Sequence, residues 1–192
     1  YDEAIAAYSR ALELYSATDS ARWFVHYTRG ISYHKVDNWP GAEADFRAAL
    51  DLQPNHPQIL NYLGYSLVER GEKLDEALQM IETAAAARPD NGAIVDSLGW
   101  VYFQLGRYEE AVVHLERAAS LEPVDPVIND HLGDAFWAVG REIEARFQWN
   151  RALSFNPEEK DVLRIRDKLK RGLDLVLVDE GLTPIRIASG DN

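Results

Sequence analysis

Between Trp23 and Glu159, the pattern of apolar and polar positions predicts a series of short amphipathic helices arranged in pairs. In each pair the first helix runs to a glycine, which is a common signal for the end of a helix. The second helix ends just before a proline, because proline disfavours helical backbone in the residue that precedes it. The glycines after the first helices include Gly71, Gly106 and Gly140, and the prolines after the second helices are Pro54, Pro89, Pro123 and Pro157.

The same residue types return in this region with a nearly constant period. Small residues occur where the two helices of a pair approach closely, and large apolar residues fill the space between neighbouring pairs. Successive members lie 34 or 35 residues apart in each of four sets: Gly30, Gly64, Gly99 and Gly133; the four prolines; Ala42, Ala77, Ala111 and Ala145; and Ala49, Ala84, Ala118 and Ala152. Because each pair leaves an apolar face that only the next pair can cover, the pattern predicts a solenoid stabilised by contacts between neighbouring repeats.

With this period, the chain resembles the tetratricopeptide repeat (TPR) family. The resemblance implies an all-α fold: a right-handed TPR superhelix (α-solenoid) of helix-turn-helix repeats with a C-terminal capping helix and a short extended tail. The predicted parts are the second helix of a truncated repeat (1–15), a linker (16–22), four TPR repeats within 23–159 (23–56, 57–91, 92–125 and 126–159), a capping helix (160–171) and an extended or flexible tail (172–192). Because Tyr1 falls within a repeat, we expect the chain to be the C-terminal part of a longer protein.

The segment 160–171 has the pattern of an end cap for such a solenoid. Val162, Ile165 and Leu169 share one helical face, and six basic residues occupy the other faces. Two interpretations of the basic residues are open. They belong to a solvated capping helix, or they form a basic docking surface for an acidic partner.

The residues after Gly172 follow a different pattern. Leu173–Val178 is an apolar, β-prone run, and Asp179–Gly181 is a turn signal. Thr183–Ile187 also favours extended backbone, although Pro184 restricts it to the edge of a sheet. Because a lone hairpin is only marginally stable in water, three alternatives are open for this tail. It is flexible, it packs on the solenoid, or it pairs with another chain.

Charge and motif content exclude several classes of function. The chain has 32 acidic residues against 20 Lys and Arg, a net charge of −12, so nucleic acid is not an expected partner. No apolar run reaches the roughly 18 residues of a membrane-spanning helix. The sequence has no cysteine, no Gly-x-Ser-x-Gly motif, no phosphate-binding loop and no metal-binding histidine spacing. We therefore expect no enzymatic activity, no cofactor and no metal site.

In the TPR fold, the first helices of successive repeats line a concave groove, and the resemblance therefore implies a set of groove residues in this chain. We expect these residues to form a peptide-binding site: Tyr27, Asn61, Tyr65, Asp96, Trp100, Phe103, Asp130, Asp134 and Trp137. The aromatic rings offer large, rigid contact area, and the amide and carboxylate groups can hydrogen-bond the backbone of an extended peptide. Alternatively, the aromatic residues pack between neighbouring first helices. The three carboxylates would repel a C-terminal carboxylate, which disfavours the ligand that TPR co-chaperones bind.

Two segments narrow the resemblance further. Residues 96–102 and 129–137 look like proteobacterial TPR proteins of the cell envelope, among which are adaptors that hold a carboxyl-terminal processing protease or recruit its substrates. We therefore expect a non-catalytic adaptor or scaffold that binds a protein or peptide partner, periplasmic or envelope-associated rather than cytoplasmic. Two alternatives are open: a self-associating assembly protein, and so a homo-oligomer, that uses its C-terminal tail; or an accessory arm of an enzyme encoded upstream.

Overall fold

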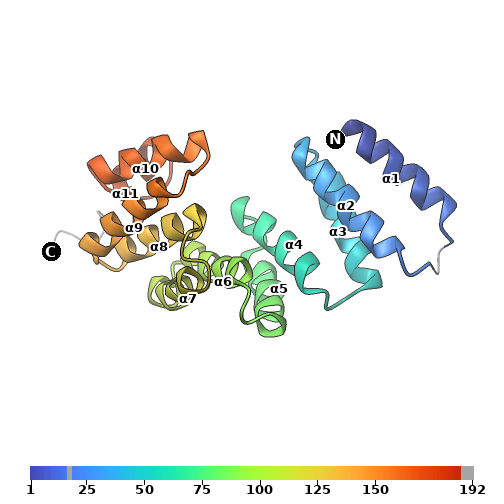
Figure 1. The fold of residues 1–192 in the computed structure, drawn as a ribbon, viewed down its shortest axis with the longest axis horizontal. Helices are drawn as coiled ribbons and strands as arrows, with labels where there is room; N and C mark the ends of the chain where they lie inside the picture. Colours follow the sequence, from blue (N-terminus) through green and yellow to red (C-terminus); the bar gives the residue numbers. More distant parts are fainter. Residues whose placement is uncertain (17–18, 187–192) are drawn as a thin grey trace. The chain divides into compact units, whose positions relative to one another are not determined.

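The computed structural model describes residues 1–16 and 19–186 of the 192-residue chain, and within these ranges the chain forms α-helices without strands. The predicted all-α solenoid of paired helices is confirmed (Figure 1). The chain divides into two compact units, Tyr1–Ala87 and Arg88–Asn192, which are described separately below. None of the helices in the described ranges is both long enough and apolar enough to cross a membrane.

The first unit consists of two helix pairs preceded by a single helix. Its helices are α1 (Asp2–Leu14), α2 (Arg22–Lys35), α3 (Trp39–Leu52), α4 (Pro57–Glu69) and α5 (Leu74–Ala87). Helix α2 packs against α3 and α4 against α5, and glycine sets the distance within each pair. A Cβ atom at Gly30 would lie 2.8 Å from the ring of Phe46, and one at Gly64 would lie 2.7 Å from Ile81.

A partly buried arginine connects α1 to the first pair. The carboxylate of Asp45 on α3 accepts two hydrogen bonds from the guanidinium of Arg29 on α2, at 2.6 and 2.8 Å. The same guanidinium donates to the hydroxyl of Ser9 on α1 at 2.9 Å. One arginine therefore links three helices of the first unit.

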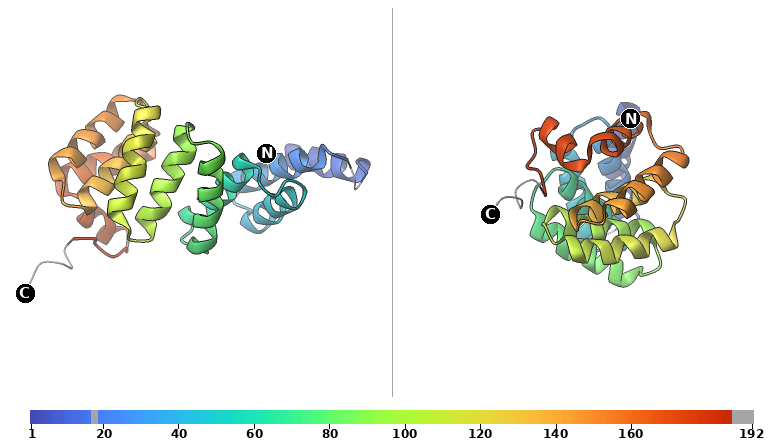
Figure 2. Two further views of the ribbon diagram at one scale, coloured as in Figure 1. Left: turned by 90° about the horizontal axis from the view of Figure 1, so that it is seen from below. Right: turned by 90° about the vertical axis from the view of Figure 1, so that its left-hand side faces the viewer.

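The second unit repeats the paired arrangement and adds two helices at its C-terminal end (Figure 2). Its helices are α6 (Gly92–Gln104), α7 (Tyr108–Leu121), α8 (Pro126–Ala138), α9 (Glu142–Ser154), α10 (Glu159–Arg171) and α11 (Leu173–Asp179). A Cβ atom at Gly133 on α8 would overlap the indole of Trp149 on α9, which is fully buried. Glycine is therefore required at this position, because it alone lets α8 approach the tryptophan.

Helix ends follow the signals in the sequence. The carboxylate of Asp125 accepts hydrogen bonds from the backbone N–H groups of Val127 and Ile128 and so caps the N-terminus of α8. After the first helix of a pair, Gly106 and Gly140 have φ angles of 73° and 83°, in the left-handed region that glycine adopts without strain.

The predicted extended tail is wrong over Leu173–Val178, which lies in helix α11. Leu173, Val176 and Leu177 are buried, a spacing that places them on one helical face. A helix satisfies its own backbone hydrogen bonds, whereas an extended segment here would need a neighbouring strand, and the described residues offer none. Of the second predicted stretch, residues 183–186 have no regular secondary structure, and residues 187–192 lie outside the described part of the chain.

Candidate binding surface on the first helices

The nine predicted groove residues are here called the first-helix surface, since all of them lie on the first helices of their pairs. Tyr27 lies on α2; Asn61 and Tyr65 on α4; Asp96, Trp100 and Phe103 on α6; and Asp130, Asp134 and Trp137 on α8. The residues of α2 and α4 belong to the first unit, and those of α6 and α8 belong to the second.

In the first unit, the three residues of the first-helix surface are half-buried. The ring of Tyr27 lies 6.1 Å from those of Phe46 and Tyr62, and burial raises the pKa of the Tyr27 phenol. Asn61 and Tyr65 lie one turn apart on α4. The side-chain oxygen of Asn61 is buried and has no hydrogen-bond partner among the described residues. This surface therefore combines aromatic area with an unsatisfied acceptor.

In the second unit, Trp100 is part of a buried aromatic stack. Its indole lies between Phe103, with ring centroids 4.8 Å apart, and the imidazole of His131 on α8, 4.0 Å away, and both neighbours are nearly parallel to it. The Nδ1 atom of His131 is 3.0 Å from each carboxylate oxygen of Asp96. Trp100 and Asp96 are thus joined through a histidine of the next repeat, and this stack packs α6 against α8.

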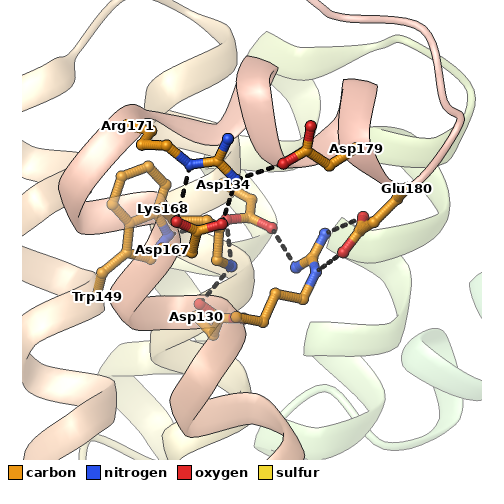
Figure 3. A network of polar contacts seen from close by, with 9 residues as sticks. Asp130, Asp134, Trp149, Asp167, Lys168, Arg171, Asp179 and Glu180 are labelled. Atoms are coloured by element: carbon orange, nitrogen blue, oxygen red, sulfur yellow. Dashed lines mark hydrogen bonds and ion pairs between the residues drawn. The ribbon is translucent and has the colours of Figure 1, made fainter.

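The two aspartates of α8 bind a buried lysine of the chain itself. The Nζ atom of Lys168 on α10 donates to Asp130 at 2.6 Å and to Asp134 at 2.7 Å, and the lysine side chain is fully buried (Figure 3). The indole N–H of Trp149 donates to the same oxygen of Asp134 at 2.8 Å. Burial raises the pKa of the Asp130 carboxyl, although the neighbouring Lys168 acts in the opposite direction.

Further ion pairs surround this buried core of the network. The guanidinium of Arg164 lies 3.5 Å from Asp134 and donates to Glu180 at 2.8 Å. That of Arg171 donates to Asp179 at 2.6 Å. Burial acts to lower the pKa of Arg164, but the hydrogen bond to Glu180 and the charge of Asp134 raise it overall, so it stays charged. Lys168, Arg164 and Arg171 all bind carboxylates of their own unit. They are therefore neither simply solvated nor free to form a docking surface for an acidic partner, the two interpretations that the sequence left open.

The last residue of the first-helix surface, Trp137, is covered by the start of α11. Its indole N–H donates to the carboxylate of Asp174 at 2.8 Å. A Cβ atom at Gly172 would overlap the Trp137 ring, and the guanidinium of Arg186 lies 5.2 Å from the ring centroid. Asp130 and Asp134 thus contact α10, and Trp137 contacts α11 and the residues that follow it.

Comparison with known protein families matches this arrangement of paired helices. Two family models, both described as tetratricopeptide repeat, match residues 27–91 and 70–132, which together span more than half of the chain. The chain belongs to the tetratricopeptide repeat family. The TPR fold is that of a protein–protein interaction scaffold, and TPR repeats are typically non-catalytic.

Individual relatives are bacterial TPR proteins. The chain is 36% identical over 81 residues to the TPR repeat-containing protein PA4667 of Pseudomonas aeruginosa, covering 42% of this chain and 14% of that protein. It is 33% identical over 107 residues to the lipoprotein NlpI homolog of Haemophilus influenzae, covering 54% of this chain and 33% of that protein. The match therefore spans a third or less of the length of each relative.

Solved TPR structures show the same fold over most of the chain. A thermophilic TPR protein from Thermus thermophilus matches with a TM-score of 0.68 at 23% identity, covering 90% of both chains. The structure titled as the functional characterization of Pseudomonas aeruginosa pilF matches with a TM-score of 0.68 at 19% identity, covering 93% of this chain and 92% of that one. At this level of identity, both show the fold alone.

Sequence reasoning placed Asp130 and Asp134 on one TPR helix face but missed their partners. Both pairs, Asp130 with Asp134 and Arg164 with Lys168, are spaced four residues apart, so each pair lies on one face of its helix. This matched spacing of opposite charges was a signal for the contact. No comparable signal pointed to the pairing of Trp137 with Asp174, because the segment that carries Asp174 was predicted to be extended.

The described residues contain no group of three or more histidine, aspartate or glutamate side chains that could hold a metal ion. The acidic side chains of Asp130 and Asp134 are bound by Lys168. This surface offers aromatic area, an unsatisfied amide oxygen and carboxylates already paired within the chain.

Proposed function

We propose that this chain is an adaptor module that binds an extended segment of a partner protein on the first-helix surface of its first unit. The observation that carries the proposal is the buried, unpartnered side-chain oxygen of Asn61, which lies one turn from Tyr65 on α4. A buried acceptor without a donor costs about 1–3 kcal/mol. In this proposal a bound peptide displaces the side chains that cover the oxygen, and one of its backbone N–H groups, which an extended backbone presents at regular intervals, then satisfies the acceptor.

Apolar side chains on α2 would add contact area. On α2, Phe24 is 53% exposed and lies one turn before the half-buried Tyr27. Large aromatic side chains are enriched among the residues that dominate binding energy at protein interfaces. The ligand that fits this surface is therefore an extended segment with at least one apolar side chain and a free backbone N–H group.

The residues of the second unit have a different role in this proposal. Asp130, Asp134 and Trp137 hold the C-terminal segment, and Asp96, Trp100 and Phe103 belong to a buried stack. They act as the framework of the second unit, whereas Tyr27, Asn61 and Tyr65 contact the partner. The alternative of self-association through the tail has less support, because α11 buries its apolar face within its own unit.

We further propose that the module acts in the bacterial cell envelope, for an envelope protease or an assembly complex. The relative named as a lipoprotein supports an envelope location, since a lipid anchor attaches a protein to a membrane surface. The segments 96–102 and 129–137, with their likeness to envelope TPR adaptors, support the same role.

A peptide library tests the binding site even though the partner is unidentified. Random peptides displayed on phage are selected on the immobilised chain, and the tightest peptide is then titrated against purified variants. Asn61→Leu removes the acceptor at similar volume, and loss of one hydrogen bond of about 1 kcal/mol weakens binding about fivefold. The same change raises the free energy of unfolding, because it removes an unsatisfied polar atom.

A variant that binds the peptide more weakly while it is more stable against unfolding identifies Asn61 as a binding residue, because a purely structural residue would not lower affinity while raising stability. Asn129→Leu is the matched control, because Asn129 is a fully buried asparagine of α8 whose side-chain oxygen also lacks a partner among the described residues. It is expected to leave peptide affinity unchanged, since Asn129 lies in the second unit, away from the proposed site. Equal affinity of the selected peptides for wild type and Asn61→Leu would refute the proposed site.

A further inference from the structure

The C-terminal segment is fitted closely to Trp137 at the end of α8. Gly172, the single residue between α10 and α11, has a φ of 85°, and a Cβ atom there would overlap the Trp137 ring. Glycine therefore meets two requirements at once, since it adopts the left-handed backbone and leaves room for the indole. The chain turns directly over the tryptophan and delivers Leu173 and Asp174 to its edge.

Asp174 makes the central contact of this segment. It is buried, with 4% of its surface exposed, and one carboxylate oxygen accepts the indole N–H of Trp137 at 2.8 Å. The other oxygen accepts the backbone N–H groups of Ile185 and Arg186 at 2.6 and 2.9 Å. Burial and the charge of Asp174 both raise the pKa of the Tyr108 phenol on α7. One carboxylate thus joins α8, α11 and the segment that follows α11.

The remaining contacts that hold α11 are few. The helix has seven residues, too few to be stable alone, and it buries only Leu173, Val176 and Leu177 besides Asp174. Its other ties to α10 are the ion pairs of Asp179 and Glu180, whose side chains are exposed, and such pairs contribute little in water. Arg186 adds one more ion pair, to Glu142 on α9 at 2.8 Å. The segment is therefore attached in the manner of a bound peptide, by one short apolar face, one buried carboxylate and ion pairs at the surface.

We propose that the Trp137 end of α8 is a binding site for an acidic-aliphatic protein segment with the pattern Leu-Asp-x-Val-Leu. Residues 172–186 occupy it as an internal ligand, and a partner segment of the same chemistry binds by displacing them. The inference rests on the proposed function in treating first helices as protein-binding surfaces. It concerns a different part of that surface, in the second unit, where residues 172–186 of the chain compete with the partner segment for the site.

The test measures whether a free peptide with the sequence of residues 172–186 binds to the full-length chain. A fluorescent synthetic peptide of residues 172–186 is titrated into the full-length chain and into full-length Asp174→Ala. In wild type the tethered segment competes at an effective concentration of about millimolar, so the free peptide binds weakly. In Asp174→Ala the tethered segment has lost its carboxylate, and the free peptide is expected to bind at least tenfold more tightly.

Three controls define the site. Leu175→Ala changes an exposed side chain on the outer face of α11 and is expected to bind the peptide as wild type does. A peptide that carries alanine at position 174 is expected to bind neither chain. Trp137→Phe, added to Asp174→Ala, removes the indole donor and is expected to weaken binding of the wild-type peptide at least fivefold.

Circular dichroism checks that each variant is folded. If Asp174→Ala is not folded, Asp174→Asn takes its place, because it keeps the shape and loses the charge; its expected gain in peptide affinity is at least threefold. The proposal is overturned if the folded variant binds the peptide no more tightly than wild type, or if it binds the alanine-174 peptide equally well. Asn61→Leu is expected to leave this binding unchanged, so either proposal can fail while the other stands.

Discussion

Replacement of Lys168 by methionine tests the buried network between α8 and α10. The lysine is fully buried, and its ammonium makes two charge-assisted hydrogen bonds, to Asp130 at 2.6 Å and to Asp134 at 2.7 Å. Methionine has a similar length and no charge, so it leaves the half-buried carboxylate of Asp130 and the buried carboxylate of Asp134 without their shared cation. Removal of one partner from a buried ion pair costs about 3–5 kcal/mol. Because Arg164 remains 3.5 Å from Asp134, we expect the lower end of this range, about 3 kcal/mol.

Urea unfolding followed by circular dichroism measures this loss. With an m value of about 1–3 kcal/mol per M, a loss of about 3 kcal/mol lowers the urea midpoint by about 1–3 M. Lys170→Met is the matched control, because Lys170 lies on the same helix and is exposed. Its expected effect is within about 0.5 kcal/mol. If Lys168→Met loses no more stability than Lys170→Met, the network does not hold the capping helix and this reasoning is wrong.

Two further predictions concern α8. Asn129→Leu is expected to lower the free energy of unfolding by about 1 kcal/mol, because the two hydrogen bonds that its side-chain nitrogen donates to Pro123 O and Asp125 O are lost while only one unsatisfied oxygen is removed; an unchanged or higher urea midpoint would contradict this. For Asp130→Asn, the sign follows from the pKa of Asp130, which burial raises above its ordinary value of 3.8. The stability contributed by the protonated carboxyl is fully present below that value and is lost as pH rises through the raised pKa. The stability of wild type therefore falls relative to Asp130→Asn as pH rises above 3.8 and through the raised pKa, and parallel curves in urea unfolding at several pH values would refute this.

The solenoid of helix pairs was predictable because its signals are local and repeated. Gly133 and Trp149, for example, are 16 residues apart, and the fit of a small residue on one helix to a large one on the next recurs at Gly30 and Phe46. A period that recurs in several residue classes determines which faces meet, and the contacts between the helices of a pair follow from it. A contact that occurs only once in the chain has no such repeated signal in the sequence.

The contacts that Asp130, Asp134 and Trp137 make with α10 and α11 each occur only once in the chain. Asp134 and Lys168 lie 34 residues apart, and the cap that carries the lysine has no counterpart elsewhere in the sequence. The sequence showed that the acidic residues share a face, but not whether a basic helix of the same chain or a partner would neutralise them. Burial decides between these outcomes, because a carboxylate that loses water must gain a cation or hydrogen-bond donors.

Helix α11 shows why local pattern fails for a short segment. Alternation in Leu173–Val178 would place Leu173, Leu175 and Leu177 on one face of a strand, and the helical pattern places Leu173, Val176 and Leu177 on one face of a helix. Over six residues both patterns are equally apolar, and β-propensity favours the strand. The structure buries Val176 and leaves Leu175 42% exposed. The helix supplies its own backbone hydrogen bonds and brings Asp174 to the indole of Trp137, so a contact 37 residues away in sequence outweighs the local preference.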